Sequence, residues 1–239
     1  MSAFPYTLET SPIPRLGLVV LQVDETIEED FRRIFPPEIA RLHISRIPSG
    51  AELNPDTIAE MEGALPAATS LLPGYEPFDA VGYACTSGTT LIGADSVHAL
   101  IAEAVPTKAA TNPLTATLAA CEHLGLKRLG IVSPYIASVA TPIRNAFTAA
   151  GLTVPETLSF GEEVEARVAR IAPTSIAEAA RTLAQRTELD GIFLSCTNLR
   201  TLDILAPLKR ELGIPILSSN QALAWHMARL SGIEIAPIL

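Results

Sequence analysis

One stretch of this chain occurs twice, and the repeat limits the folds that the chain can adopt. The copies cover residues 78–89 and 189–200. Each has an Asp, a short apolar run and then Cys-Thr, so that Cys85 and Cys196 are offset by 111 residues. Such a run predicts a buried strand, although periodicity alone does not exclude a buried helix segment. We therefore expect two strands that end in cysteine at the edge where parallel sheets bind ligands.

A second repeat extends the symmetry. Residues 15–20 and 128–133 match at an offset of 113 residues, and both are predicted strands. Strand and helix patterns alternate along the whole chain, which favours parallel α/β sheets. We predict an α/β fold with two pseudo-symmetric halves, each a roughly four-stranded parallel sheet flanked by helices. Facing each other, the halves would place their two thiols on opposite walls of one cleft.

The repeat also predicts how the chain divides. We expect residues 1–112 with 221–239 to form the half that carries Cys85. Residues 113–220 would form the half that carries Cys196.

Composition limits the partners. The chain is 48% hydrophobic and 18% charged, which suits a folded core. The net charge is −9 and Lys and Arg do not cluster, which argues against nucleic acid and anionic membranes. The sequence has no apolar run of 18 residues, so it predicts no membrane span. Residues 1–14 lack a secretory signal pattern and the three cysteines are an odd number, so we expect reduced thiols and a cytoplasmic protein.

The two repeated cysteines are the candidate catalytic residues. A helix N-terminus lowers the pKa of a thiol, and the thiolate is the reactive form. One thiolate can remove a proton while the other thiol supplies one to the opposite face; alternatively, one sulfur can add to an alkene and be eliminated. Free backbone N–H groups after each cysteine would bind a carboxylate. Those groups belong to residues that include Thr86, Ser87, Thr197 and Asn198.

Each of these positions also has an ordinary structural interpretation. A buried cysteine is a common small hydrophobe, and we assign Cys121, which has no repeat partner, to the core. Asp24 follows the first strand and is either a helix cap or a site residue. Tyr135 follows the matching strand of the second half and either holds a substrate carboxylate or packs.

Metal and cofactor motifs are not found. The four histidines have no ligand spacing and no paired-Cys motif occurs, so we expect no metal. Gly-rich phosphate motifs are also missing, so no nucleotide cofactor is indicated. The acidic stretch with Glu162, Glu163 and Glu165 is typical of a solvated turn.

These motifs resemble the aspartate/glutamate racemase superfamily, in particular the branch with maleate cis-trans isomerase, arylmalonate decarboxylase and the ectoine-utilisation proteins. Residues 24–28 and 160–163 are most similar to the ectoine-utilisation proteins. The resemblance implies a cofactor-independent enzyme with two Rossmann-like halves and a cleft between them. The strongest similarity lies in residues 83–89, 133–135, 195–201 and 218–222.

The resemblance also implies roles for single residues. Cys85 and Cys196 match the two catalytic cysteines, and Tyr135 matches a tyrosine that contacts a substrate carboxylate in the maleate isomerases. Because the decarboxylase keeps only the second cysteine, the pair favours isomerase or racemase chemistry. The positions that hold the carboxylate match Thr86, Ser87, Thr197 and Asn198.

The chain departs from the maleate isomerase pattern at two positions. Asp24 and Glu163 align with asparagines that hold the dicarboxylate in those enzymes. A carboxylate there repels a second substrate carboxylate and attracts an ammonium group. We therefore expect a substrate with an amine and one carboxylate, such as an ectoine-derived diamino acid.

Three hypotheses follow. The first is an isomerase or racemase of a small carboxylate or amino acid, maleate isomerase-like, with a place in ectoine degradation. The second is a lyase of the arylmalonate decarboxylase type, in which Cys196 alone protonates an enediolate. The third is a non-catalytic sensor that binds small acids between two lobes. A homo-oligomer remains open, because no stretch singles out an interface.

Overall fold

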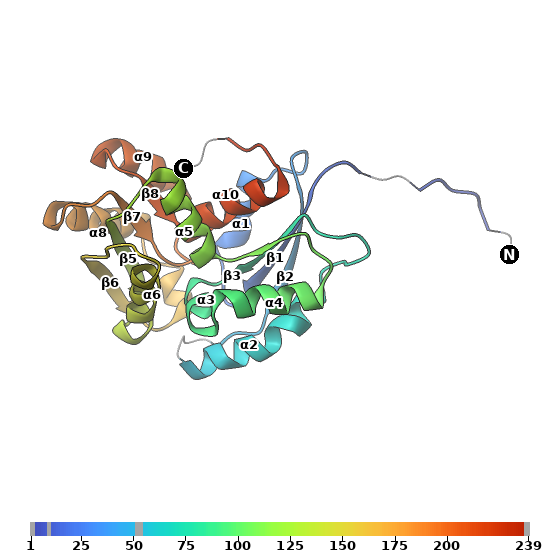
Figure 1. The fold of residues 1–239 in the computed structure, drawn as a ribbon, viewed down its shortest axis with the longest axis horizontal. Helices are drawn as coiled ribbons and strands as arrows, with labels where there is room; N and C mark the ends of the chain where they lie inside the picture. The colour runs from blue at the N-terminus through green and yellow to red at the C-terminus, as the bar shows by residue number, and fades with distance from the viewer. Residues whose placement is uncertain (1–2, 9–10, 51–54, 237–239) are drawn as a thin grey trace.

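The computed structural model describes residues 3–8, 11–50 and 55–236. Its core contains two four-stranded sheets, and every strand pair in them is parallel. The strand orders, β2-β1-β3-β4 and β6-β5-β7-β8, are the same order repeated (Figure 1). The predicted α/β class with two matching parallel sheets is therefore confirmed. The division of the chain into two domains remains a prediction.

Helices connect the strands and cover the sheets. The first sheet comprises β1 (Arg15–Leu21), β2 (Arg41–Ile47), β3 (Ala80–Ala84) and β4 (Ala110–Thr111). The second comprises β5 (Leu129–Tyr135), β6 (Thr157–Glu162), β7 (Gly191–Leu194) and β8 (Ile216–Ser218). The helices are α1 (Ile27–Ile34), α2 (Pro55–Thr69), α3 (Thr86–Ile92), α4 (Ala94–Ala104), α5 (Pro113–Leu124), α6 (Ala137–Ala149), α7 (Glu165–Val168), α8 (Pro173–Arg186), α9 (Leu202–Leu212) and α10 (Ser219–Ser231).

Both faces of the first sheet are buried. Alternate residues of a strand point to opposite faces. Val19 and Tyr83 belong to the apolar cluster that includes α2 and α4, whereas Leu18 and Ala84 belong to the cluster that includes α1 and α10. This double coverage explains why the strands are continuous apolar runs in the sequence.

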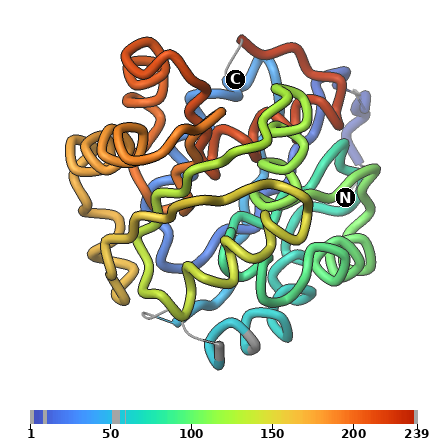
Figure 2. Tube along the Cα trace, turned by 60° about the vertical axis from the view of Figure 1, so that its left-hand side comes forward, coloured from blue at the N-terminus to red at the C-terminus, as the bar shows by residue number. Residues whose placement is uncertain are grey.

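The C-terminal helix returns to the first sheet. Helix α10 packs on β3 and beside α5 and α1, and it also contacts β8 of the second sheet (Figure 1; Figure 2). Its buried face includes Ala222, Leu223 and Met227, which belong to the cluster on β1 and β3. The helix therefore contacts both sheets near the ends of β3 and β7.

Two boundaries differ from the expectation. After the helix that Gly151 ends, the sequence predicts a strand over residues 152–158. Strand β6 instead lies at 157–162, because it is a half-exposed edge strand without an apolar run. The helix expected directly after Cys196 is absent there: a turn follows, and α9 begins at Leu202. In the described part of the chain, no helix combines the length and apolar character needed to cross a membrane.

Candidate functional site

The first cysteine occupies the sharp turn between β3 and α3. Cys85 has an extended backbone and is the N-cap of α3. Its Sγ accepts a hydrogen bond from the Gly88 N–H at 3.2 Å and lies 3.6 Å from Ser87 Oγ. A Cβ at Gly88 would lie 2.7 Å from Tyr83 Oη and 2.9 Å from Cys85 Sγ. Glycine at position 88 is therefore required by close approach to the sulfur.

The second cysteine occupies the matching turn after β7. Cys196 Sγ accepts hydrogen bonds from Tyr135 Oη–H at 2.9 Å and from the Asn198 N–H at 3.3 Å. The Cys196 N–H donates to Ser219 Oγ at 3.0 Å. Tyr135 is 4% exposed and ends β5, the strand beside β7. The tyrosine that the sequence predicts as a substrate contact thus bonds a thiol in this structure.

Hydrogen bonds join the two cysteine turns directly. Thr86 Oγ1 lies 2.9 Å from Ser219 Oγ, the same hydroxyl that accepts from Cys196. Thr197 Oγ1–H donates to the Ala84 carbonyl oxygen at 3.3 Å. All of these groups are buried. The structure therefore brings the two Cys-Thr segments together, although they lie 111 residues apart in the sequence.

Asn198 links three segments around the second cysteine. Its Oδ1 accepts from the Glu25 N–H at 2.9 Å, and its Nδ2 donates to Glu165 Oε2 at 3.1 Å. Its backbone oxygen accepts from Thr26 Oγ1–H at 3.0 Å. These contacts hold the chain after Cys196 in a turn, which is why the expected helix does not start there. The Asn198 side chain bonds protein groups, so it acts on the site by fixing this turn.

Asp24 takes part in local structure and also lies at the site. Its Oδ1 accepts from the N–H groups of Thr26 and Ile27 at 2.8 and 2.9 Å, which stabilises the start of α1. The residue is 3% exposed, and its Oδ2 has no hydrogen-bond partner among the described residues. Burial raises the pKa of this carboxyl, against the smaller lowering effects of the Ile27 and Thr26 N–H groups and of the nearby Thr197 hydroxyl.

The structure places a different glutamate at the site from the one that the sequence suggests. Glu163 is exposed, and its N–H bonds the side chain of Glu162. Glu165, two residues on, is 3% exposed and bonds Asn198. The missed signal was the helical spacing of Glu165 and Val168, which together form the buried side of α7.

The electrostatics of the thiols are opposite to the prediction. Burial raises the pKa of Cys85 to about 11, against the lowering effect of hydrogen bonds from Ser87 and Gly88. Burial also raises the pKa of Cys196 well above its ordinary value, and the charge of Glu165 raises both thiol pKa values further. The predicted lowering of the thiol pKa by a helix end is therefore wrong, because desolvation outweighs it.

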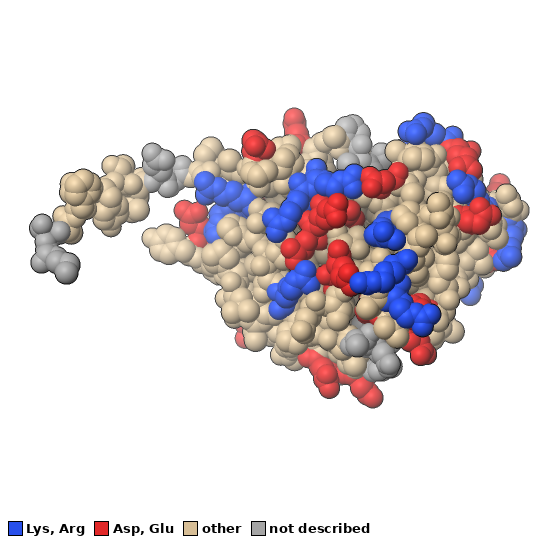
Figure 3. All heavy atoms as spheres, turned by 180° about the vertical axis from the view of Figure 1, so that it is seen from behind, with Lys and Arg blue, Asp and Glu red and all other residues tan. Residues whose placement is uncertain are grey.

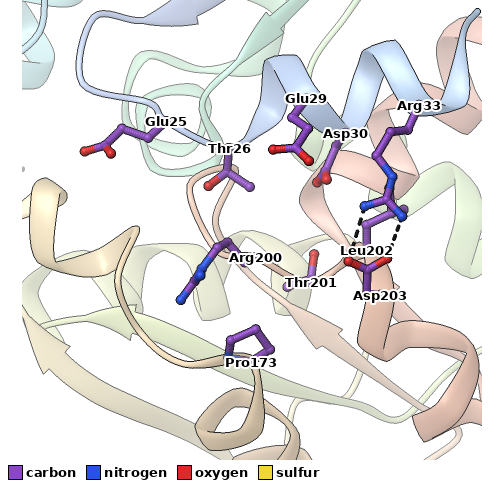
Figure 4. Close-up of a pocket in the computed structure, with 10 residues that line it drawn as sticks. All are labelled: Glu25, Thr26, Glu29, Asp30, Arg33, Pro173, Arg200, Thr201, Leu202 and Asp203. Atoms are coloured by element: carbon purple, nitrogen blue, oxygen red, sulfur yellow. Dashed lines mark hydrogen bonds and ion pairs between the residues drawn. The ribbon is translucent and has the colours of Figure 1, made fainter.

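A small cavity adjoins the second cysteine turn. It has a volume of about 180 Å³ and lies between α1 and the turn before α9 (Figure 4). An ion pair between Arg33 and Asp203 at 2.5 Å spans its edge. Asp30 lines it, and burial raises the pKa of this carboxyl to about 6.

Figure 3 shows acidic and basic side chains interspersed on one face, without a large patch of one sign.

Fold and site together define an α/β protein with two matching parallel sheets and a buried thiol at the same turn after each. Residues 78–237 match the arylmalonate decarboxylase family, and the chain belongs to this family. It is 33% identical to the arylmalonate decarboxylase of Bordetella bronchiseptica over 124 residues, which is 51% of each chain. It is 24% identical to the maleate isomerase of Nocardia farcinica over 236 residues, 94% of this chain and 92% of the other.

Solved structures confirm the shared fold. The Nocardia farcinica maleate cis-trans isomerase, as a cysteine-to-serine mutant with a covalently bound succinylcysteine intermediate, superposes with a TM-score of 0.83 at 22% identity, covering 95% of this chain and 96% of the other. The maleate isomerase from Pseudomonas putida S16 superposes with a TM-score of 0.82 at 19% identity, covering 95% of this chain and 96% of the other. The family resemblance drawn from the sequence is confirmed, whereas its link to ectoine utilisation stays a hypothesis.

Proposed function

We propose that this protein is a cofactor-independent isomerase or racemase of a small carboxylate, with Cys85 and Cys196 as its catalytic residues. The observation that carries this proposal is the pair of equivalent buried thiols. Each sulfur accepts a backbone N–H, and the turns that hold them are hydrogen-bonded to each other. The covalent cysteine intermediate named for a structural relative supports chemistry at sulfur.

Two balanced reactions are open to such a pair. In racemisation, one thiolate takes the proton from the carbon next to the carboxylate, and the other thiol donates a proton to the opposite face. In cis-trans isomerisation, a thiolate adds to the alkene, the new single bond rotates, and elimination releases the thiolate and the rotated alkene. In either case the donors to sulfur, Gly88 and Ser87 at Cys85, and Tyr135 and Asn198 at Cys196, stabilise the thiolate.

Proton NMR in deuterated water tests this proposal. The panel contains maleate, aspartate, glutamate, a substituted malonate and diamino acids, including ectoine-derived ones. We expect deuterium at the carbon next to the carboxylate, or a new isomer. The signal should be lost in Cys85→Ala and in Cys196→Ala but kept in Cys121→Ala, whose thiol is buried in the apolar core. Turnover that survives either of the first two substitutions would remove the two-thiol mechanism.

A decarboxylase is the second candidate, and the family match favours it. In that reaction Cys196 alone would protonate the enediolate left after loss of CO₂. Cys85→Ala separates the candidates, because it should abolish a two-thiol reaction and spare a one-thiol reaction. Release of CO₂ from the substituted malonate by Cys85→Ala protein would establish the lyase.

A further inference from the structure

Two carboxyl groups are buried beside the thiols without an ion-pair partner among the described residues. Asp24 and Glu165 are each 3% exposed. Arg46 donates to the backbone oxygens of Leu21, Gln22 and Asp24 and forms its ion pair with Glu28. Burial raises the pKa of the Asp24 carboxyl more than the charge of Arg46 lowers it. Acidic side chains are seldom buried this fully unless they are paired, because desolvation strongly opposes the charge. This pair therefore requires an explanation other than packing.

The two carboxyl groups share one environment with the thiols. Asn198 joins Glu165 to the segment that follows Asp24, through its bonds to Glu165 Oε2 and to the Glu25 N–H. Burial raises the pKa of Glu165 most, and the negative charge of Asp24 raises it further; burial likewise dominates for Cys196, whose pKa the charges of Glu165 and Asp24 raise further. Asp24 Oδ2 is buried without a hydrogen-bond partner in the described part of the chain. The site thus has one buried carboxyl oxygen without a hydrogen-bond partner among the described residues, and two carboxyl groups whose ionised forms burial disfavours.

We propose that Asp24 and Glu165 form a subsite for a cationic group and select a substrate that carries a protonated amine as well as a carboxylate. The inference rests on the proposed function only for the role of the adjacent thiols. An ammonium group has three donors and no acceptor, so it suits Asp24 Oδ2 beside a second carboxylate. A dicarboxylate would bring a further negative charge to the same place, which Coulomb repulsion opposes.

The same subsite would prepare the thiols for reaction. Burial and then the charge of Glu165 raise the pKa of both cysteines and so favour their protonated forms. An ammonium group between the carboxylates and the sulfurs would offset that charge, because an opposite charge nearby favours the ionised thiol. The charge of the ammonium group would then both select the amine substrate and favour the reactive thiolate. The relatives named maleate isomerases act, by their names, on a dicarboxylate, so specificity would differ within the family.

Calorimetric binding at pH 8 to the full chain tests the subsite. The probes are two matched pairs, succinate with 4-aminobutanoate and malonate with 3-aminopropanoate, in which one carboxylate is replaced by an aminomethyl group. We expect each amine to bind at least about tenfold more tightly than its dicarboxylate, as about 1.4 kcal/mol of differential attraction requires. The double variant Asp24→Asn, Glu165→Gln should lose or reverse this preference. Glu103→Gln, on the exposed side of α4, should keep it.

The outcomes separate this inference from the proposed function. Equal binding within each pair, tighter binding of the dicarboxylates, or no binding of either amine would overturn the subsite. Any of these results would leave two-thiol turnover of another carboxylate intact. Amine preference that disappears in the double variant, in protein that exchanges no deuterium, would support the subsite and remove the proposed function. Asn and Gln are close in shape to the residues they replace, and denaturant unfolding of the variants checks that they fold.

Discussion

At the scale of single residues, the bond from Tyr135 Oη–H to Cys196 Sγ, at 2.9 Å, is the shortest hydrogen bond to either thiol among the described residues. Hydrogen bonds to charged groups contribute about 1.5–3 kcal/mol. If Cys196 reacts as a thiolate, Tyr135→Phe should lower kcat about 10- to 100-fold, because each 1.4 kcal/mol is a factor of ten in rate. Steady-state kinetics with the substrate found by NMR would measure this, with KM changing less than kcat.

The control for this substitution is Tyr75→Phe, which removes the same hydroxyl from a ring that is 99% exposed. It should leave kcat unchanged. An unchanged kcat in Tyr135→Phe would show that the hydroxyl is not needed while Cys196 reacts, and would return Tyr135 to a packing role.

Glu165 should make the folded state less stable as the pH rises. Burial raises its pKa from 4.5 to about 7, so between these values the folded protein binds a proton that the unfolded chain does not. The free energy of unfolding therefore falls as the pH increases through this window, by about 3 kcal/mol at most. Glu165→Gln should remove this part of the slope and stabilise the protein at pH 8 by about 1–3 kcal/mol.

Urea unfolding at pH 5 and pH 8 measures that difference. Glu103→Gln, an exposed residue of α4, serves as the control and should leave the pH dependence unchanged. A Glu165→Gln protein that is less stable than the wild type at pH 8 would mean that the ionised carboxylate is well compensated in the fold.

Residue chemistry was predictable where a repeat marked it. Cys85 and Cys196 stood out because the same polar turn followed two apolar strands. Glu165 did not, because three acids within four residues resemble a solvated turn, and burial of one of them depends on what packs above it. The predicted lowering of the thiol pKa values was wrong for the same reason: a sequence shows where a strand ends but not how deeply the residue after it is buried.

At the scale of elements, the turn from β3 into α3 leaves no room for a side chain at position 88. Gly88→Ala would place a methyl group 2.9 Å from Cys85 Sγ and 2.7 Å from Tyr83 Oη, so one of them must move. We expect a loss of turnover of about 100-fold or more, because misplacement of about 1 Å is sufficient for that. Deuterium exchange at saturating substrate measures it.

The matched substitution is Gly63→Ala on α2, where an added Cβ meets nothing within 4 Å. Alanine is favoured over glycine inside a helix by about 1 kcal/mol, so this variant should be slightly more stable and fully active. Equal activity of the Gly88→Ala and Gly63→Ala proteins would show that the Cys85 turn can shift without consequence.

Elements were predictable where burial was uniform. Strands β1, β3, β5 and β7 are central in their sheets and covered on both faces, which makes them apolar runs. Edge strand β6 has exposed residues at positions 159–161, so its sequence resembles a loop. The turn after Cys196 was not predictable, because Asn198 holds it through partners such as Glu25, 173 residues away in the sequence.

At the scale of the whole molecule, buried polar groups link the segments around the two sheets. Asn220 Nδ2 donates to Asp30 Oδ2 at 2.8 Å and to the Thr197 carbonyl oxygen at 2.9 Å. Ser219 similarly bonds both Thr86 and Cys196. Two parallel sheets were evident from the repeat, but these contacts were not, because pattern analysis does not pair residues across such distances.

Separating the two sheets would break these hydrogen bonds, each worth about 0.5–1.5 kcal/mol net. It would also expose the apolar cluster that contains residues of both sheets, such as Tyr83 and Phe193. We therefore expect a single cooperative unfolding transition. The one tryptophan, Trp225 on α10, reports on the junction, whereas far-UV circular dichroism reports on both sheets. The two signals should change at the same urea concentration. If circular dichroism instead persists beyond the loss of the Trp225 signal, one half is stable alone, and the contacts between the cysteine turns serve the reaction more than the fold.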